Sequence, residues 1–275
     1  MVLLLLAAAW LAGCQDVIEV DLGDGAPARL VVEGGVVHGE PVQTIRLSTT
    51  SPYFDADVSP PVPGASVTLA DDAGATVALE EAEPGVYRGA LRAEIGRTYT
   101  LDLEVGGERY RAVETLRAVA PIDSAFVVFE EGQGPDPEDG YRVRVSFRDP
   151  AGRGDAYRWQ TVVDGRNRLP AEVRPIPSLL RDDELFDGLE VEAYSPNPEV
   201  AFQPGETVTV RQSSLTSQAL TFFELVLQQA AGRPGPFEVP PADIRGNVAN
   251  LTDPARPAFG YFWVRDVSVA VLEVP

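Results

Sequence analysis

The sequence predicts a mainly β protein, with an N-terminal immunoglobulin-like β-sandwich followed by a second β-rich domain that carries one amphipathic helix. Many short runs alternate apolar and polar residues with a period of two, which gives a strand one buried and one solvated face. Turn signals rich in Gly, Pro and Asp separate these runs, and the 25 Gly and 24 Pro favour many turns and few helices. Short strands at this spacing are typical of sandwiches and barrels.

The chain begins with an apolar run over residues 2–10, followed by Leu11-Ala12-Gly13-Cys14. The run is shorter than the roughly 20 residues that span a bilayer, and it has the length of a secretory signal core. Residues 1–13 are therefore expected to be a lipoprotein signal peptide. Leu-Ala-Gly-Cys resembles the bacterial lipobox, so Cys14 is the expected lipid attachment site, with a buried core cysteine as the alternative. Residues 14–27 are expected to form an acidic tether.

Residues 28–119 have the size and pattern of one immunoglobulin-like sandwich. Alternating runs stand at residues 65–69 and 99–105, and turn signals stand at residues 71–74 and 83–85. This part contains strand and turn patterns only, so we expect a sandwich without helices.

Residues 120–275 are expected to form the second domain. Alternation over residues 141–147, 208–210 and 264–274 predicts strands. Residues 214–231 instead repeat apolar side chains at spacings of three and four, which predicts a helix packed against a sheet rather than a binding groove. The apolar positions of this helix are Leu215, Ala219, Phe222, Phe223, Val226 and Ala230.

The ends of this helix carry recognisable capping residues. Ser214 or Thr216 is expected to cap its start, because a hydroxyl can accept a hydrogen bond from a free backbone N–H of the first turn. Gly232 and Pro234 are expected to end it, since both residue types are common just beyond helix C-termini.

The chain is strongly acidic, with 42 acidic residues against 22 basic residues and a formal net charge of −20. All of these basic residues are Arg. A field this negative argues against nucleic acid and anionic membrane surfaces as partners. Most carboxylates are expected to form a solvated surface, with cation binding or a basic partner as the alternative.

Few residues offer catalytic chemistry. His38 is the only histidine, and it is expected in a solvated turn, with a catalytic role as the alternative. With Cys14 lipidated, one imidazole cannot assemble a zinc site. A phosphate loop of the Gly-x-x-x-x-Gly-Lys form is missing, because the chain has no Lys. The sequence therefore predicts no catalytic residues, no cofactor and a non-enzymatic protein.

One acidic segment, residues 181–188, is a weak candidate for a cation site. Its acids are Asp182, Asp183, Glu184 and Asp187. Clustered carboxylate oxygens suit calcium, although the spacing does not match an EF-hand. The alternative is a structured turn packed through Leu185 and Phe186.

Several stretches, taken in chain order, carry a resemblance to a known family. They are Leu30-Val31-Val32-Glu33-Gly34, Gly64-Ala65-Ser66-Val67, Gly85-Val86-Tyr87, Gly96-Arg97-Thr98-Tyr99-Thr100-Leu101, Phe147-Arg148-Asp149-Pro150, Asp183-Glu184-Leu185-Phe186-Asp187-Gly188, Pro240-Pro241-Ala242-Asp243-Ile244-Arg245-Gly246-Asn247-Val248 and Phe259-Gly260-Tyr261-Phe262. In this order they resemble a Bacteroidota lipoprotein family catalogued as domain of unknown function, family 4249. The likeness covers nearly all of the chain after Cys14.

The resemblance implies a place in the cell but no catalytic residues. Members are outer-membrane lipoproteins, often encoded beside TonB-dependent transporters of the starch-utilisation type. Asp16, Glu19 and Asp21 also resemble the acidic export signal of surface lipoproteins in that phylum, which favours the cell surface over the periplasmic face. Asp123-Ser124-Ala125 resembles the phylum's O-glycosylation sequon, so Ser124 is a glycosylation candidate.

Together these features lead to one expected function and two alternatives. The expected function is a lipoprotein held on the outer membrane through Cys14, which captures an unknown small ligand for a TonB-dependent barrel or acts as its lid. One alternative is a carboxylate-based glycan hydrolase, which requires two opposed acids. The other is a purely structural envelope lipoprotein.

Overall fold

The computed structural model describes residues 28–51, 59–132, 138–169, 179–231 and 244–275. The signal peptide, Cys14, the acidic tether, Gly232 and Pro234 lie outside the described residues. Within these residues the protein is mainly β, as predicted, with one helix. None of the helices in the described part is long and apolar enough to cross a membrane.

The strands of the first half alternate inward and outward side chains, as their sequence patterns predict. They are β1 (Leu30–Val37), β2 (Val42–Thr49), β3 (Ser66–Asp71), β4 (Thr76–Glu83), β5 (Val86–Ala90), β6 (Thr98–Val105) and β7 (Glu108–Thr115). Their sheet runs in the order β15-β7-β6-β3-β4-β5-β2-β1-β16. Residues 76–79 of β4 pair with β3 and residues 80–83 pair with β5, so β4 belongs to both layers of a folded sheet. The inward side chains, such as Val32, Leu47 and Leu101, fill the space between the layers.

A second sandwich follows. Its elements are β8 (Ile122–Glu130), β9 (Gly140–Arg148), β10 (Ala156–Val163), β11 (Arg166–Asn167), β12 (Leu180–Asp182), β13 (Glu190–Tyr194), β14 (Thr207–Leu215) and β17 (Val267–Glu273). One sheet has the order β13-β9-β8, and the other has the order β11-β10-β14-β17, with β12 beside β10. Phe147, Trp159 and Val210 meet in the core between them. The sandwich architecture predicted from the sequence is therefore confirmed.

The strand pairing differs from the predicted domain division in one respect. The division assigns residues 120–275 to the second domain, whereas β15 (Ala249–Asn250) pairs with β7 and β16 (Phe259–Arg265) pairs in parallel with β1. Phe262 and Val264 are buried in the first core. The chain thus returns to the first sandwich before β17 joins the second, because the edge of β1 offers free backbone groups and the apolar face of β16 completes the core.

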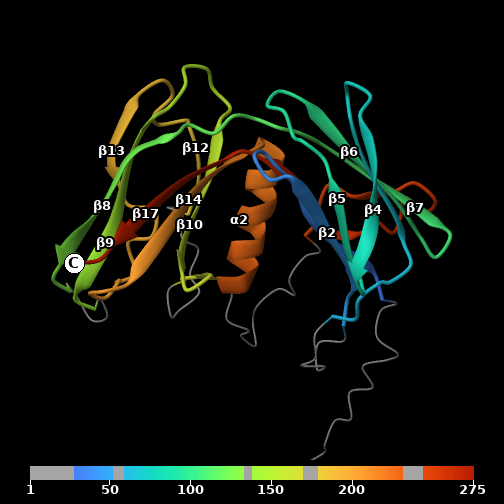
Figure 1. The fold of residues 1–275 in the computed structure, drawn as a ribbon, viewed down its shortest axis with the longest axis horizontal. Coiled ribbons are helices and arrows are strands. Elements are labelled where there is room, and N and C mark those ends of the chain that lie inside the picture. The colour runs from blue at the N-terminus through green and yellow to red at the C-terminus, as the bar shows by residue number, and fades with distance from the viewer. Residues whose placement is uncertain (1–27, 52–58, 133–137, 170–178, 232–243) are drawn as a thin grey trace, which may run out of the picture.

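Helix α2 (Ser217–Ala231) lies between the two sandwiches (Figure 1). Thr216 is the N-cap, since its Oγ1 accepts a hydrogen bond from the Ala219 N–H at 3.2 Å. Ser214 and Leu215 belong to β14, so the helix begins later than the expected residue 214. The apolar stripe packs on residues of both sandwiches, which are Ala156, Leu180, Leu215, Tyr261 and Trp263. The first part of the predicted stripe is therefore core, whereas Val226 and Ala230 are exposed and Leu220 and Leu227 pack in their place.

Candidate functional site

The structure places the predicted glycosylation residue on a strand. Ser124 is exposed on β8, beside the bulge that shifts the pairing with β9 between residues 122 and 124. Its hydroxyl is thus accessible, although it lies in a strand rather than in a loop.

The acidic segment 181–188 does not bring its four acids together. Of these four, only Asp183 joins a cluster, and its partners there are Asp149 and Asp155, with carboxylate oxygens within 4.8 Å of one another. Asp182 and Glu184 are exposed. The sequence therefore pointed to one residue of this cluster and missed the two that the loop after β9 supplies.

Two of the three carboxylates in this cluster, those of Asp183 and Asp149, accept hydrogen bonds from other groups of the chain. Asp183 Oδ2 accepts from the Gly154 N–H at 2.9 Å and from the Asp155 N–H at 3.2 Å. Asp149 accepts from the Tyr157 hydroxyl at 2.6 Å and from the Gly188 N–H at 3.0 Å. Burial, and then the charges of Asp149 and Asp183, raise the pKa of Asp155. Two of the three carboxylates thus hold loops in place, which agrees with the structured turn weighed for this segment.

The same turn packs through only one of the two expected side chains. Phe186 contacts the second core, where it lies 5.9 Å from the Phe147 ring. Leu185 is 75% exposed, contrary to the expectation.

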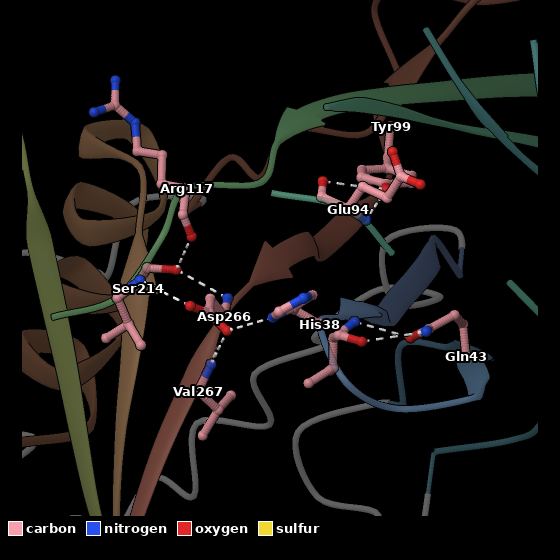
Figure 2. Close-up of polar contacts among 10 residues, drawn as sticks. His38, Gln43, Glu94, Tyr99, Arg117, Ser214, Asp266 and Val267 are labelled. Carbon is pink, nitrogen blue, oxygen red and sulfur yellow. Dashed lines mark hydrogen bonds and ion pairs between the residues drawn. The ribbon is translucent and has the colours of Figure 1, made fainter. Parts of the chain in front are cut away.

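His38 lies in the turn after β1, as predicted, and its side chain is 38% exposed. It joins a hydrogen-bonded group at the junction of the sandwiches (Figure 2). Asp266, the single residue between β16 and β17, accepts from His38 Nδ1 at 2.8 Å, from the Val119 N–H at 3.0 Å and from the Val267 N–H at 3.0 Å. Because Asp266 holds His38 with a carboxylate, the pair resembles two members of a catalytic triad. Ser214, however, is bonded to other partners.

The Ser214 hydroxyl is held by backbone groups. It donates to the Arg117 carbonyl at 2.8 Å and accepts from the Asp266 N–H at 2.9 Å (Figure 2). No hydrogen bond between Ser214 and His38 is found among the described residues. These hydrogen bonds therefore hold the segments at the junction together. Among the described residues, Ser214 lacks the hydrogen bond to His38 that a serine nucleophile and its base would share.

A pocket of about 580 Å³ lies beside this junction. The first sandwich lines it with residues of β1, β2, β16 and the turn after β1, and the second sandwich lines it with residues of β10, β14 and β17. Val208 and Val210 of β14 point into the second core, so Arg211 and Ser213 face outward toward the pocket. The pocket is thus formed between the outer faces of two sheets.

Close backbone approach shapes one wall of the pocket. Gly35 on β1 pairs with Trp263 on β16, and a Cβ on Gly35 would lie 1.7 Å from the Trp263 carbonyl oxygen and 2.9 Å from its ring. Only glycine at position 35 therefore lets the Trp263 backbone and ring lie this close to β1. Gln43 fixes the rim, because its amide donates to the Glu40 carbonyl at 2.8 Å and to the Leu91 carbonyl at 3.0 Å.

Three arginines gather at this surface. Arg211 and Arg265 line the pocket, and Arg158 lies next to them on β10. Burial, followed by repulsion from Arg158 and Arg211, lowers the pKa of Arg265 to about 10. The guanidinium of Arg158 lies 4.5 Å from the Phe223 ring centroid, and that of Arg265 lies 5.5 Å from the Trp263 ring centroid. Both arginines are half-buried, and the rings stabilise them by cation–π attraction.

The sequence analysis did not single out these arginines. Each follows an apolar or aromatic residue in an alternating strand, as in Tyr157-Arg158-Trp159, so each is predicted to face outward. Because the chain has a net charge of −20, an arginine predicted on the outer face of a strand is the sequence signal that could have identified them. Their convergence depends on the pairing of β10 with β14 and on the path from β16 to β17.

The described residues define two β-sandwiches with helix α2 packed between them and a pocket lined by arginines at their junction. The chain passes from the first sandwich to the second where β16 leads through Asp266 into β17. The chain belongs to the family described as Domain of unknown function (DUF4249), which matches residues 15–269. Among curated proteins, none matches the chain. One similar solved structure is a two-domain fibronectin type-III segment from chicken tenascin, with 16% identity, a TM-score of 0.22, and coverage of 69% of this chain and 92% of the tenascin chain.

Proposed function

We propose that the protein is a non-enzymatic binding protein of the outer membrane, anchored by lipid on Cys14, that captures a small ligand in the junction pocket and presents it to a TonB-dependent barrel. The observation that carries the proposal is the pocket of about 580 Å³ formed jointly by both sandwiches. Ligand sites of roughly 300–1,000 Å³ are typical, and they occur preferentially between domains.

The lining of the pocket favours binding over hydrolysis. Valines such as Val42 and Val269 give it apolar walls, and a few polar groups stand among them. Of the described residues that line it, Glu40 is the single carboxylate. A glycan hydrolase uses two acids that face each other across the scissile bond. The glycan hydrolase alternative therefore has no specific support at this pocket.

The envelope location is supported by sequence features. Leu11-Ala12-Gly13-Cys14 follows a run of signal-peptide length, and the family resemblance is to outer-membrane lipoproteins. One diacylglycerol-modified cysteine with a further acyl chain supplies enough buried methylene groups for stable anchoring.

Extraction from the native membrane tests the anchoring and the partner. The full chain, tagged after Pro275, is solubilised in mild detergent and purified, and the co-purifying proteins are identified by mass spectrometry. A TonB-dependent barrel in near-equal amount is the expected result. Cys14→Ala is expected to move the chain to the soluble fraction. Recovery of the chain alone would contradict the partner, and an unchanged membrane fraction for Cys14→Ala would contradict the anchor.

Ligand capture is tested with a pair of tryptophan variants. Val269 lines the pocket and is 54% exposed, whereas Val271 is 62% exposed on the same face of β17, and the pocket lining does not include it. Val269→Trp is expected to fill the pocket and to abolish binding of any glycan, peptide or small molecule found in a thermal-shift screen. Val271→Trp is expected to bind normally. Equal binding by both variants, or turnover of the bound compound, would overturn the proposal.

A further inference from the structure

Two of the three arginines at the junction are neighbours in one sheet, and the third comes from the sheet of the first sandwich. Ser213 on β14 pairs with Arg158 on β10 and with Val267 on β17. Arg211 precedes Ser213 by two residues on the same face of β14, and Arg265 precedes Val267 by two residues. Same-face neighbours of this kind lie within reach of long side chains. Arg158 and Arg211 therefore lie beside Ser213 in the sheet, and Arg265 of β16 lines the same pocket as Arg211 and Ser213.

Within the described part of the chain, these arginines lack the carboxylate partners that other arginines have. Arg111 pairs with Asp102 at 2.7 Å, and Arg168 pairs with Glu206 at 2.8 Å. Among the described residues, no carboxylate forms an ion pair with Arg158, Arg211 or Arg265. Three arginines thus lie close together without an ion pair among the described residues, although Glu40 lines the same pocket.

Buried polar atoms without partners lie in the same place. The Arg265 Nε and the Ser213 Oγ are both buried, and neither has a hydrogen-bond partner among the described residues. Both residues line the pocket. A buried donor without an acceptor is costly. Arg158 and Arg265 are half-buried and Arg211 is exposed, so it is the Arg265 Nε that needs an acceptor, which an anion in the pocket would supply.

We propose that the junction pocket binds the carboxylate group of a small molecule that also has an apolar part, with Arg211 and Arg265 as the direct carboxylate ligands. The planar guanidinium fork matches a carboxylate with two parallel hydrogen bonds. The pocket lining also has apolar surface near Arg211 and Arg265, from Val37, Val42, Val267 and Val269. Such a lining suits a ligand whose carboxylate adjoins a hydrocarbon chain or ring. Arg158 is a positioning residue that acts on Arg265.

This inference rests on the proposed capture function, because it names the ligand class for the same pocket. The probes are octanoate and benzoate, with octanol as the uncharged match for octanoate and sodium sulfate as an oxyanion without an apolar part. Titration calorimetry on the full chain is expected to show binding of both carboxylates, with octanol weaker by about 10-fold or more. Binding of sulfate as strong as that of octanoate would show a general oxyanion site and overturn the carboxylate assignment.

Charge-neutral variants assign the site. Arg211→Gln and Arg265→Gln are each expected to weaken octanoate by about 10-fold or more. Arg168→Gln removes the same charge from a residue outside the pocket lining, and it is expected to bind octanoate normally. Without ligand, Arg265→Gln is expected to melt at the same or a higher temperature than the wild type, because it removes repulsion from Arg158 and Arg211. An arginine with a purely structural role would instead destabilise the fold when replaced.

The outcomes separate the two proposals. Equal binding of octanoate and octanol, both lost in Val269→Trp, would retain the capture pocket and overturn the carboxylate class. The same conclusion would follow if neither carboxylate bound at saturating concentration, while a neutral compound from the screen bound the wild type and failed to bind Val269→Trp. Binding of octanoate that survives Val269→Trp would overturn both proposals.

Discussion

Asp266 is the residue at which the two sandwiches are joined by side-chain hydrogen bonds. Its carboxylate accepts from His38 in the first sandwich and from the Val267 N–H at the start of β17 (Figure 2). It also accepts from the Val119 N–H in the connecting segment. The Asp266 N–H donates to Ser214 on β14. One side chain therefore fixes the directions of three segments of the chain.

Asp266→Ala is expected to lower the free energy of unfolding by about 1–3 kcal/mol, because it leaves the Val119 N–H without its acceptor in a partly buried place. His38→Ala is the matched control. The His38 ring is 38% exposed, so water can replace its bond, and the expected loss is about 0–1 kcal/mol. Guanidinium unfolding curves measure both values. Equal losses for the two variants would show that His38 is the main partner.

Asp155, unlike Asp266, carries a charge that opposes folding. Its pKa is raised above the ordinary value of 3.8 by burial and by Asp149 and Asp183. The folded chain therefore retains this proton at pH values where the unfolded chain has lost it. Its contribution to stability falls as the pH rises from 3.8 through the raised pKa, and at neutral pH the charged group is destabilising.

Asp155→Asn is expected to raise the melting temperature at neutral pH by about 2 °C and to have no effect at a pH below 3.8. Asp149→Asn is the control, and it is expected to lower the melting temperature. The two Asp149 oxygens accept from the Tyr157 hydroxyl and the Gly188 N–H, and an amide keeps only one acceptor oxygen for these two donors. Thermal melts in calcium and in EDTA complete the test. If the wild type lost stability in EDTA and Asp155→Asn were destabilising, the cluster would be a cation site rather than a set of loop contacts.

At the scale of single elements, β16 has the largest effect on domain structure. Phe262 is fully buried and Val264 is 3% exposed in the first core, although both lie near the end of the chain. Burying each such side chain contributes about 1.5–3 kcal/mol, against a total stability of about 5–15 kcal/mol for a domain. The first sandwich without β16 thus loses a large part of its stability.

A fragment of residues 28–119 is therefore expected to lack a cooperative thermal transition. The same fragment with residues 244–266 joined through a flexible linker is expected to fold, and circular dichroism with amide-proton chemical-shift dispersion measures this. Joining residues 267–275 instead supplies β17, which pairs with β14, and it is expected to leave the fragment unfolded. Cooperative unfolding of residues 28–119 alone would restore the division at residue 119.

The strands were largely predictable, whereas their partners were not. Alternation identifies a strand such as β9 because one face of the strand is buried, and this is a local property. The parallel pairing of β1 with β16 has no turn signal, since the two strands come from opposite ends of the described chain. The helix was predicted from its apolar stripe. It begins at Ser217 rather than at residue 214, because Leu215 is buried as the last residue of strand β14.

The candidate site was less predictable than the fold for the same reason. Each of Arg158, Arg211 and Arg265 looks like an ordinary solvated arginine in its own strand. Their shared surface is defined by strand register, by the path through Asp266 and by the cover that α2 provides. Composition predicted an acidic protein correctly, and an average over the whole chain could not reveal a local group of positive charges.

At the scale of the whole molecule, helix α2 packs on both sandwiches and is expected to couple their unfolding. The rings of Phe222 and Phe223 on α2 lie 4.9 and 6.1 Å from the Tyr261 ring of β16, while the same helix packs on Leu180 and Leu215 of the second sandwich. A shared apolar core of this kind couples the unfolding of two domains. The wild type is therefore expected to unfold in one calorimetric transition.

The double variant Phe222→Ala, Phe223→Ala is expected to separate this transition into two and to lower the stability of the junction by about 2–4 kcal/mol. The first sandwich should remain folded, because the Tyr261 hydroxyl still donates to Glu114 at 2.6 Å inside it. Leu225→Ala, on a side of α2 where the leucine is 44% exposed, is the control and is expected to keep one transition. Small-angle X-ray scattering should show a larger radius of gyration for the double variant only. If calorimetry instead gave one transition at the control's temperature, the sandwiches would be coupled through β16, Asp266 and β17 rather than through α2.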